Sequence, residues 1–248
     1  MSGSITLENR FGVNKMELIS LKYAIFVIVL LVLYYCFPKK YRWYVLLAGS
    51  MAYYVIICKW YVLFIIFTIC TTYGSTIWID KLLKEQNAIV KSHKEDWDRQ
   101  TRKEYKEKGR KKRVAVMLFA LLCNFGILAF LKYIPYAGEL GLLLPLGISF
   151  YTFQSMGYVM DVYREIVEPE KNFLKVALFV SFFPQIIQGP IAIYDKLAGQ
   201  LYEGHSLRLE NLQKGALLVL WGVMKKLVIA DRAVNIINFV MDKPMDFS

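Results

Sequence analysis

The chain has few charged residues and very few histidines for its length. Of 248 residues, 21% are charged and 56% are hydrophobic, and the mean hydropathy is +0.38. A soluble domain of this size needs more polar residues to cover its surface, so this composition excludes an ordinary soluble protein. The two histidines are His93 and His205, and no His/Cys/carboxylate cluster has metal-ligand spacing. We therefore expect no bound metal.

Several sequence signals of soluble enzymes are also missing. The chain contains no Gly-x-Ser-x-Gly segment, which excludes the usual serine-hydrolase signature. It contains no Gly-x-x-x-x-Gly-Lys segment, which excludes the usual nucleotide-phosphate loop. The four cysteines lie in or beside apolar segments and imply no disulfide framework: Cys36, Cys58, Cys70 and Cys123. We expect these thiols to pack against lipid or the protein core.

The apolar residues are gathered into about seven blocks. Several blocks approach the roughly 20 residues that a helix needs to cross a bilayer. They are Leu21–Phe37, Trp43–Ile57, Trp60–Ile79, Val114–Leu131, Leu142–Met160, Phe173–Ile187 and Ala216–Ala230. The sequence therefore predicts an all-α, polytopic transmembrane helical protein. The first block is followed by Pro38-Lys39-Lys40 without a small-residue cleavage site, so we interpret it as a retained signal anchor.

The distribution of charge predicts an orientation in the membrane. The formal net charge is +11. The segment 81–113 carries thirteen basic and six acidic residues, so a net charge of +7 lies between two apolar blocks. Basic segments between spans mark the cytoplasmic side. This places residues 1–20 and the Lys132–Gly141 turn outside the cell, residues 21–79 in three transmembrane helices, and residues 80–113 in a basic cytoplasmic loop.

The basic loop has two interpretations that the sequence leaves open. It is a solvated connector that also contacts anionic membrane lipid, or it is a docking surface for an acidic cytoplasmic partner such as an acyl carrier or a coenzyme with phosphates. Because the positive charge is confined to one loop between spans, we do not expect nucleic acid as a partner.

Two polar stripes enter the apolar blocks. If Ser149–Asp161 is helical, one face carries Tyr151, Gln154, Ser155, Tyr158 and Asp161. The next apolar block carries Ser181, Gln185 and Gln188 at i, i+4 and i+7. Such groups are costly against lipid, so both stripes should face protein or a wet cavity. They can serve as interhelical hydrogen-bond partners, as walls of a passage, or as both.

Two prolines and one pair of charged residues in this region carry further predictions. Pro184 should kink its helix and free the carbonyl of Val180, and Gly189-Pro190 should end the helix. An irregular backbone of this kind suits the lining of a passage or a simple helix end. Asp161 and Arg164 lie three residues apart at the predicted cytoplasmic mouth. They are interpreted either as an ion pair with each other or, for Arg164, as a contact to an anionic donor headgroup.

Four motifs in this region resemble the membrane-bound O-acyltransferase family. They are Pro145–Gln154 (PLGISFYTFQ), Asp161–Arg164 (DVYR), Ser181–Gln185 (SFFPQ) with Gly189-Pro190-Ile191, and Gly222–Arg232 (GVMKKLVIADR). Together they run from about Leu142 to Arg232. The chain is most similar to the bacterial branch that O-acetylates exported polysaccharides, with the branch that moves D-alanine towards teichoic acids as the nearest alternative.

The resemblance implies a partial ring of membrane helices in the cytoplasmic (inner) membrane, with residues 114–248 as its core. The implied activity moves an acyl group, acetyl in the favoured branch, from a cytoplasmic thioester to an exported polymer. The donor is acetyl-CoA or an acyl carrier protein, no cofactor is bound tightly, and an extracytoplasmic acyltransferase is an implied partner. The two stripes and Arg164 become substrate-binding candidates, and Pro184, Gly189 and Pro190 become structural ones. A transporter or a non-catalytic scaffold is the remaining alternative.

The chain departs from the family pattern in its histidines. The family's near-invariant histidine lies in a late apolar segment beside Trp and Gly, whereas His93 lies in the basic loop and His205 in a polar connector. No catalytic residue is therefore assigned. The chain also ends in the loop-like segment Lys243–Ser248. We expect it to be an N-terminal portion of an acyltransferase, and to be inactive alone.

Overall fold

The computed structural model describes residues 21–93, 96–133, 145–230, 232–234 and 237. Every regular element in this part of the chain is helical, which confirms the predicted all-α class. The predicted N-terminus (1–20), most of the Lys132–Gly141 turn and the Lys243–Ser248 tail lie outside the described residues.

The first helices follow the predicted apolar blocks closely. Helix α1 spans Leu21–Cys36 and α2 spans Arg42–Cys58, with the short 3-10 helix η2 (Lys39–Tyr41) between them. A second 3-10 helix, η3 (Lys59–Tyr61), joins α2 to α3 (Val62–Ser92). Lys59 adopts a positive φ of 48° at this junction, where the chain changes direction.

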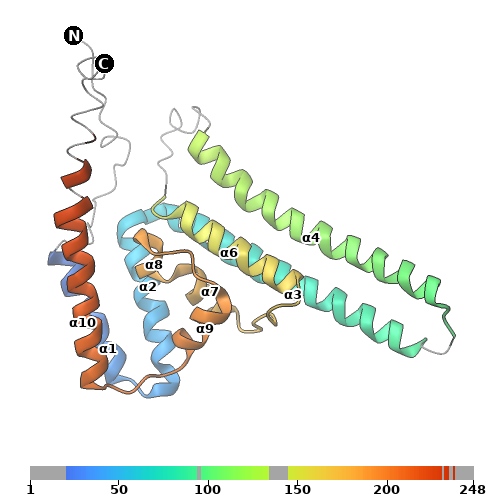
Figure 1. Cartoon of the computed structure of the whole chain (residues 1–248), viewed down its shortest axis with the longest axis horizontal. Helices are drawn as coiled ribbons and strands as arrows, with labels where there is room; N and C mark the ends of the chain where they lie inside the picture. Colours follow the sequence, from blue (N-terminus) through green and yellow to red (C-terminus); the bar gives the residue numbers. More distant parts are fainter. Residues whose placement is uncertain (1–20, 94–95, 134–144, 231, 235–236, 238–248) are drawn as a thin grey trace, which may run out of the picture.

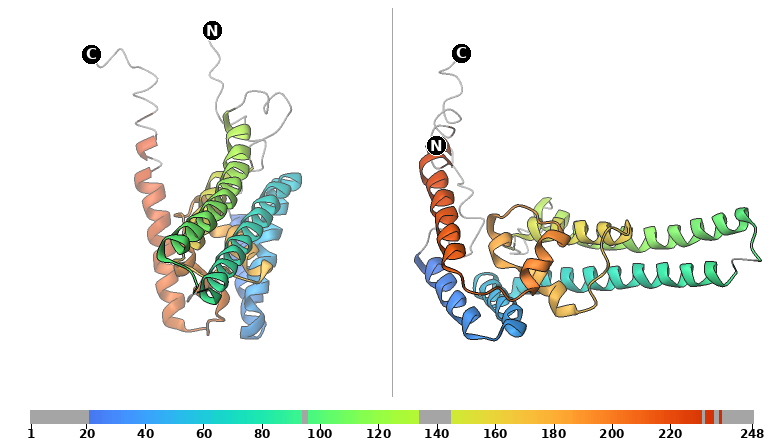
Figure 2. Two further views of the ribbon diagram at one scale, coloured as in Figure 1. Left: turned by 90° about the vertical axis from the view of Figure 1, so that its right-hand side faces the viewer. Right: turned by 60° about the horizontal axis from the view of Figure 1, so that its bottom comes forward.

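Helices α3 and α4 form a long hairpin that extends well beyond the apolar blocks. Helix α4 spans Arg99–Tyr133 and packs along α3. The views in Figures 1 and 2 show both helices projecting together from the rest of the molecule. The basic segment, which was predicted as a loop, is thus helical up to Ser92 and again from Arg99. Lys, Arg, Glu and Gln are good helix formers, which explains the continuation.

The core lies where α2, α3, α6 and α7 meet. Helix α6 spans Ile148–Tyr163 and packs on α3 and α4, while α7 (Phe173–Ser181) packs on α2 and α3. Fully buried aromatic and aliphatic side chains fill the centre: Tyr53, Tyr54, Ile65, Tyr151, Met156, Tyr158, Val176 and Phe179. This core positions the motif-bearing helix α6 against α3 and α4, with α7 beside it.

The remaining helices are shorter or lie at the edge. Helices α8 (Phe183–Gln188) and α9 (Tyr194–Tyr202) follow α7 and pack against α2. Helix α10 (Leu209–Met224) continues into a π-helical turn, η4 (Lys225–Ala230), and stands apart from the core in Figure 2. Its apolar side chains are exposed, with Leu218 at 72%.

The apolar surface fits a membrane helical protein. The helical stretches Lys39–Ser92 and Arg99–Tyr133 are long and apolar enough to cross a bilayer, and α1 and Phe173–Ile186 are shorter apolar helices. Large apolar side chains are exposed on several faces, including Leu122 at 73% and Ile56 at 61%. Soluble monomers rarely expose contiguous apolar surface on this scale, whereas lipid covers it.

Candidate functional site

The first polar stripe lies on the buried side of α6. Tyr151, Gln154, Ser155 and Tyr158 are at most 4% exposed, so the prediction that this face points away from lipid is confirmed. The Gln154 Nε2 donates a hydrogen bond of 2.8 Å to the backbone oxygen of Phe179 on α7. The Ser155 Oγ donates to the Tyr151 carbonyl at 2.6 Å. The Gln154 bond joins α6 to α7, whereas the Ser155 bond lies within α6.

Tyr151 brings two distant helices together at the start of α6. Its ring meets the Tyr54 ring of α2 edge-on, with ring centroids 6.3 Å apart. Cys58 lies close to the same hydroxyl groups and is itself buried. Neither tyrosine hydroxyl makes a hydrogen bond of ordinary geometry within the described part of the chain. Two hydroxyl groups without such partners are unusual in a packed interior.

Tyr158 ties α6 to the segment that follows it. Its hydroxyl accepts a hydrogen bond of 2.8 Å from the Glu170 backbone N–H, and its ring stacks on Tyr194 of α9 at 4.1 Å. Nearby on α9, the Tyr202 hydroxyl donates to the Lys175 carbonyl at 2.8 Å. Burial raises the pKa of Tyr202 well above its usual range, so the hydroxyl stays protonated and remains a donor.

The second polar stripe lies at a break between two helices. Ser181 is fully buried, and its Oγ donates to the Ala177 carbonyl at 2.7 Å within α7. Gln185 on α8 is partly buried, and its Oε1 has no hydrogen-bond partner among the described residues. The side chain of Gln188 lies outside the described residues.

The predicted proline kink is wrong in its position. The chain leaves the helix at Phe182, with φ −58° and ψ 103°, before Pro184 is reached. Pro184 then lies in the first turn of α8, where a missing N–H is tolerated because the first helical N–H groups have no partner within the helix. The Phe183 N–H instead donates to Ser50 of α2 at 3.4 Å. As predicted, α8 ends at Gly189-Pro190.

Gly147 connects two of the sequence motifs directly. Its φ is +69°, a left-handed conformation that favours glycine. A Cβ at this position would lie 2.4 Å from the backbone oxygen of Ile186 and 2.2 Å from its Cγ2. The segment Pro145-Leu146-Gly147 therefore packs against the backbone of α8 at a distance that only glycine allows.

The predicted ion pair between Asp161 and Arg164 is absent from the described part of the chain, so that interpretation is wrong. Arg164 is exposed and Asp161 is partly buried. The ion pair near them joins Arg113 of α4 to Glu165, with the Arg113 Nη1 3.2 Å from the Glu165 Oε1. Glu165 has a φ of +61°, which turns the chain after α6 and points its side chain towards α4. Neither residue was predicted, because nothing in a run of bases distinguishes the one that is buried, and Glu165 lies 52 residues from its partner.

Both histidines lie on the surface away from the stripes. His93 follows α3, and its ring stacks on Trp97 at 4.9 Å. His205 follows α9, and one ring nitrogen lies 3.0 Å from the Gln200 carbonyl. The His205 backbone oxygen also accepts from Arg42. None of these contacts joins a histidine ring to a residue of either polar stripe.

Several known proteins are similar in sequence to part of this chain. The chain is 31% identical to a peptidoglycan O-acetyltransferase of Helicobacter pylori over 170 residues, covering 53% of this chain and 32% of that protein. It is 40% identical to a probable alginate O-acetylase AlgI of Pseudomonas syringae over 89 residues, covering 36% of this chain and 17% of that protein. A probable AlgI of Pseudomonas putida is 34% identical over 114 residues, covering 46% and 22%.

The resemblance to the O-acetylating branch of the membrane-bound O-acyltransferases is confirmed. The chain spans about a third of the peptidoglycan O-acetyltransferase and a smaller part of the alginate O-acetylases. No family model and no solved structure matches it.

Proposed function

We propose that this chain forms part of a membrane O-acyltransferase that moves an acetyl group from a cytoplasmic thioester towards an exported polysaccharide. The observation that supports this most directly is its 31% identity, over 170 residues, to a peptidoglycan O-acetyltransferase. Its 40% identity to a probable alginate O-acetylase, over a shorter stretch, also supports acetyl as the acyl group. The acceptor in this proposal is an exported polysaccharide or another cell-envelope polymer.

The geometry of the motif region is compatible with this role. Gly147 and Gln154, both in the motif Pro145–Gln154, hold α6 against α8 and α7 through Ile186 and Phe179. In the proposed enzyme, this packed unit is the wall against which the acyl passage is built. The stripe residues position that wall, and no step of acyl transfer is assigned to a side chain of this chain. An extracytoplasmic acyltransferase that completes the transfer is part of the proposal.

The proposed orientation places the tip of the α3–α4 hairpin in the cytoplasm. Its support is the net charge of +7 in residues 81–113. A reporter enzyme inserted in the exposed turn near Asp98 should report the cytoplasm. Activity of a reporter that works only outside the cytoplasm would overturn the orientation.

The function is tested in the organism that produces the protein. Deleting the coding sequence should lower the ester-linked acetate that mild alkali releases from envelope polysaccharides, and a wild-type copy should restore it. A copy carrying Gly147→Val should not, because the motif region no longer packs.

Three outcomes separate the alternatives in that experiment. A loss of ester-linked D-alanine with unchanged acetate would replace the proposal with D-alanyl transfer. Unchanged amounts of both esters would favour a transporter or scaffold and would contradict acyl transfer. A specific loss of acetate supports the proposal.

A further inference from the structure

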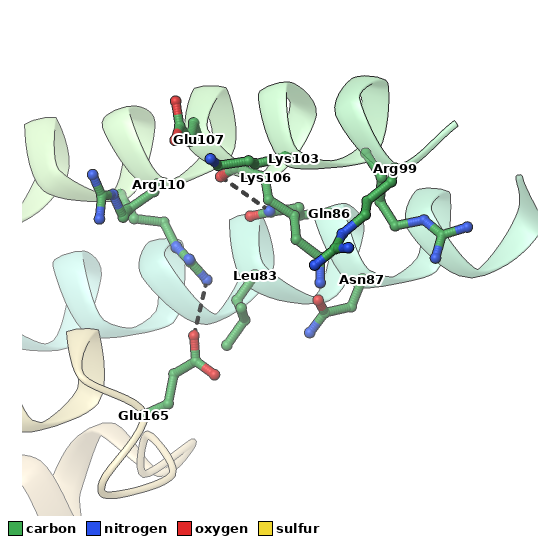
Figure 3. A pocket seen from close by; sticks show the side chains of 11 residues that line it. Leu83, Gln86, Asn87, Arg99, Lys103, Lys106, Glu107, Arg110 and Glu165 are labelled. Carbon is green, nitrogen blue, oxygen red and sulfur yellow. Dashed lines mark hydrogen bonds and ion pairs between the residues drawn. The ribbon is translucent and has the colours of Figure 1, made fainter. Parts of the chain in front are cut away.

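A basic groove lies between α3 and α4 in the projecting part of the hairpin. Its cavity has a volume of about 530 Å³, and Figure 3 shows the side chains around it. Six basic side chains line it: Arg99, Arg102, Lys103, Lys106, Arg110 and Arg113. The two acidic lining residues are Glu107 and Glu165, so the lining carries four more positive than negative charges. We call this cavity the basic groove.

The six bases share one face of α4. They fall at i, i+3, i+4, i+7, i+11 and i+14 from Arg99, which is the spacing of a helical stripe. This is the face turned towards α3, where a helical hairpin usually carries apolar side chains. Like charges four residues apart on a helix repel each other and destabilise it. A bound anion relieves that repulsion.

Two contacts fix the spacing of the helices around the groove. Gln86 of α3 is 6% exposed, and its Nε2 donates to the Lys106 carbonyl at 3.2 Å. A Cβ on Gly109 would lie 2.4 Å from the Gln86 Oε1, so the glycine lets this side chain reach α4. The Gln86 Oε1 is buried without a hydrogen-bond partner in the described part of the chain. The groove is therefore held by specific packing.

One ion pair closes the inner end of the groove. The Arg113 side chain is 10% exposed and meets Glu165 at 3.2 Å, while the Arg113 Nε is buried without a partner among the described residues. Arg99, Lys103 and Lys106 are exposed along the groove. Their ammonium and guanidinium groups are the usual protein partners of phosphate oxygens.

We propose that the basic groove binds a soluble molecule through its phosphate groups. The volume lies within the range of about 300–1,000 Å³ that is typical of small-molecule pockets. Docking of an acidic carrier protein needs roughly 800 Å² of surface on each partner, so a concave groove of this size suits the smaller ligand better. On the proposed function, on which this identification rests, the ligand is the phosphorylated end of a coenzyme-type thioester donor.

The length of the groove favours a soluble ligand over a lipid headgroup. Arg113 adjoins the apolar segment that begins at Val114, and Arg99 lies fourteen residues away along one continuous helix. At 1.5 Å per residue this is about 21 Å. The headgroup layer is only about 5–8 Å thick on each side of the hydrocarbon core. For a helix that runs along the membrane normal, the outer half of the groove therefore extends beyond the reach of lipid phosphates.

The test measures binding of coenzyme A to the full chain in nanodiscs of zwitterionic lipid, with inorganic pyrophosphate as competitor. The double variant Lys103→Glu, Lys106→Glu reverses two groove charges. The matched control Lys111→Glu, Lys112→Glu makes the same charge change on α4 outside the groove. We expect the groove variant to weaken binding at least tenfold, the control to weaken it less than threefold, and pyrophosphate to compete.

Several results would overturn the proposal. Equal weakening by both double variants would show a diffuse electrostatic effect, and no binding by the wild-type chain at millimolar coenzyme A would exclude the site. Abolition of binding in nanodiscs of anionic lipid would assign the groove to headgroups. Groove-dependent binding of an acidic acyl carrier protein without binding of coenzyme A would assign it to a protein. If the double variant fails to fold, Lys103→Gln serves in its place, with a several-fold loss expected.

The binding measurement is independent of acyl transfer. In one outcome, the chain binds coenzyme A while deletion of the coding sequence leaves envelope acetate unchanged. That result would contradict the proposed function but not the proposed binding site in the groove. Loss of acetate together with absent binding would contradict the groove alone.

Discussion

The packed face of α6 and the basic groove of the α3–α4 hairpin both place polar side chains between helices, but in opposite ways. On α6, the stripe residues from Tyr151 to Tyr158 are at most 4% exposed, and Gln154 donates to a backbone carbonyl of the neighbouring helix. In the groove, most of the bases are exposed around a cavity of about 530 Å³.

Polar side chains thus have two different roles in these two regions. A neutral amide or hydroxyl group can be satisfied inside a helix pair, because one or two hydrogen bonds suffice. Like charges cannot satisfy one another, and the groove lining sets six bases against only two carboxylates, so an excess of positive charge is left for an anion to neutralise. We therefore expect substitutions on α6 to change stability and substitutions in the groove to change binding.

The largest effect is expected at Gly147. Substituting valine forces a β-branched residue into a left-handed conformation and brings its Cβ onto the Ile186 backbone. Strain at such a φ costs about 1–3 kcal/mol, and the clash with a rigid backbone adds to it. We expect loss of most folded protein, measured as the monodisperse fraction in detergent and by its thermal midpoint. Gly157→Val is the control, because a Cβ there meets nothing within 4 Å; an equal loss for both variants would contradict the explanation.

A smaller effect is expected at Gln154. Substituting leucine removes the donor to the buried Phe179 carbonyl and leaves that oxygen unpaired. An unsatisfied buried group costs about 1–3 kcal/mol. The thermal midpoint should fall by several degrees while coenzyme A binding stays within twofold. Gln154→Glu, measured at a pH low enough to protonate its carboxyl, retains a donor and should lose less; equal losses would show that packing rather than the hydrogen bond is responsible.

The smallest effect on stability is expected from the groove itself. Lys103 and Lys106 are exposed, and the hydrogen bond from Gln86 reaches the backbone of Lys106 rather than its side chain. The double charge reversal should therefore shift the thermal midpoint by about 1 °C or less while binding falls. A large loss of stability would mean that these side chains also hold the hairpin together.

Much of the helical framework follows from sequence pattern. The apolar blocks at Leu21–Phe37 and Trp43–Ile57 match α1 and α2 within a few residues. The spacing of Tyr151, Gln154, Ser155 and Tyr158 identified the buried face of α6 correctly, because helical periodicity is a local property. The roles of these residues in substrate binding stay predictions.

Other features depend on contacts between distant segments. The break at Phe182, rather than at Pro184, is accompanied by a contact from Ser50, 133 residues earlier in the chain. The pairing of Arg113 with Glu165 depends on how α6 ends beside α4. Neither contact could be predicted from residue spacing, because the two partners of each contact lie far apart in the sequence.

The sequence by itself determined that the chain is helical, apolar and strongly basic in one segment, and its motifs carried the resemblance to O-acetylases. Composition and periodicity are local properties of the sequence, so they can be assessed without knowledge of the fold. Only the tertiary structure decided that the polar stripe is closed by α7 while the bases enclose an open groove. That outcome depends on where Gly147 meets Ile186 and where Gln86 meets Gly109. Such close approaches are set by the packing of whole helices, which no local pattern encodes.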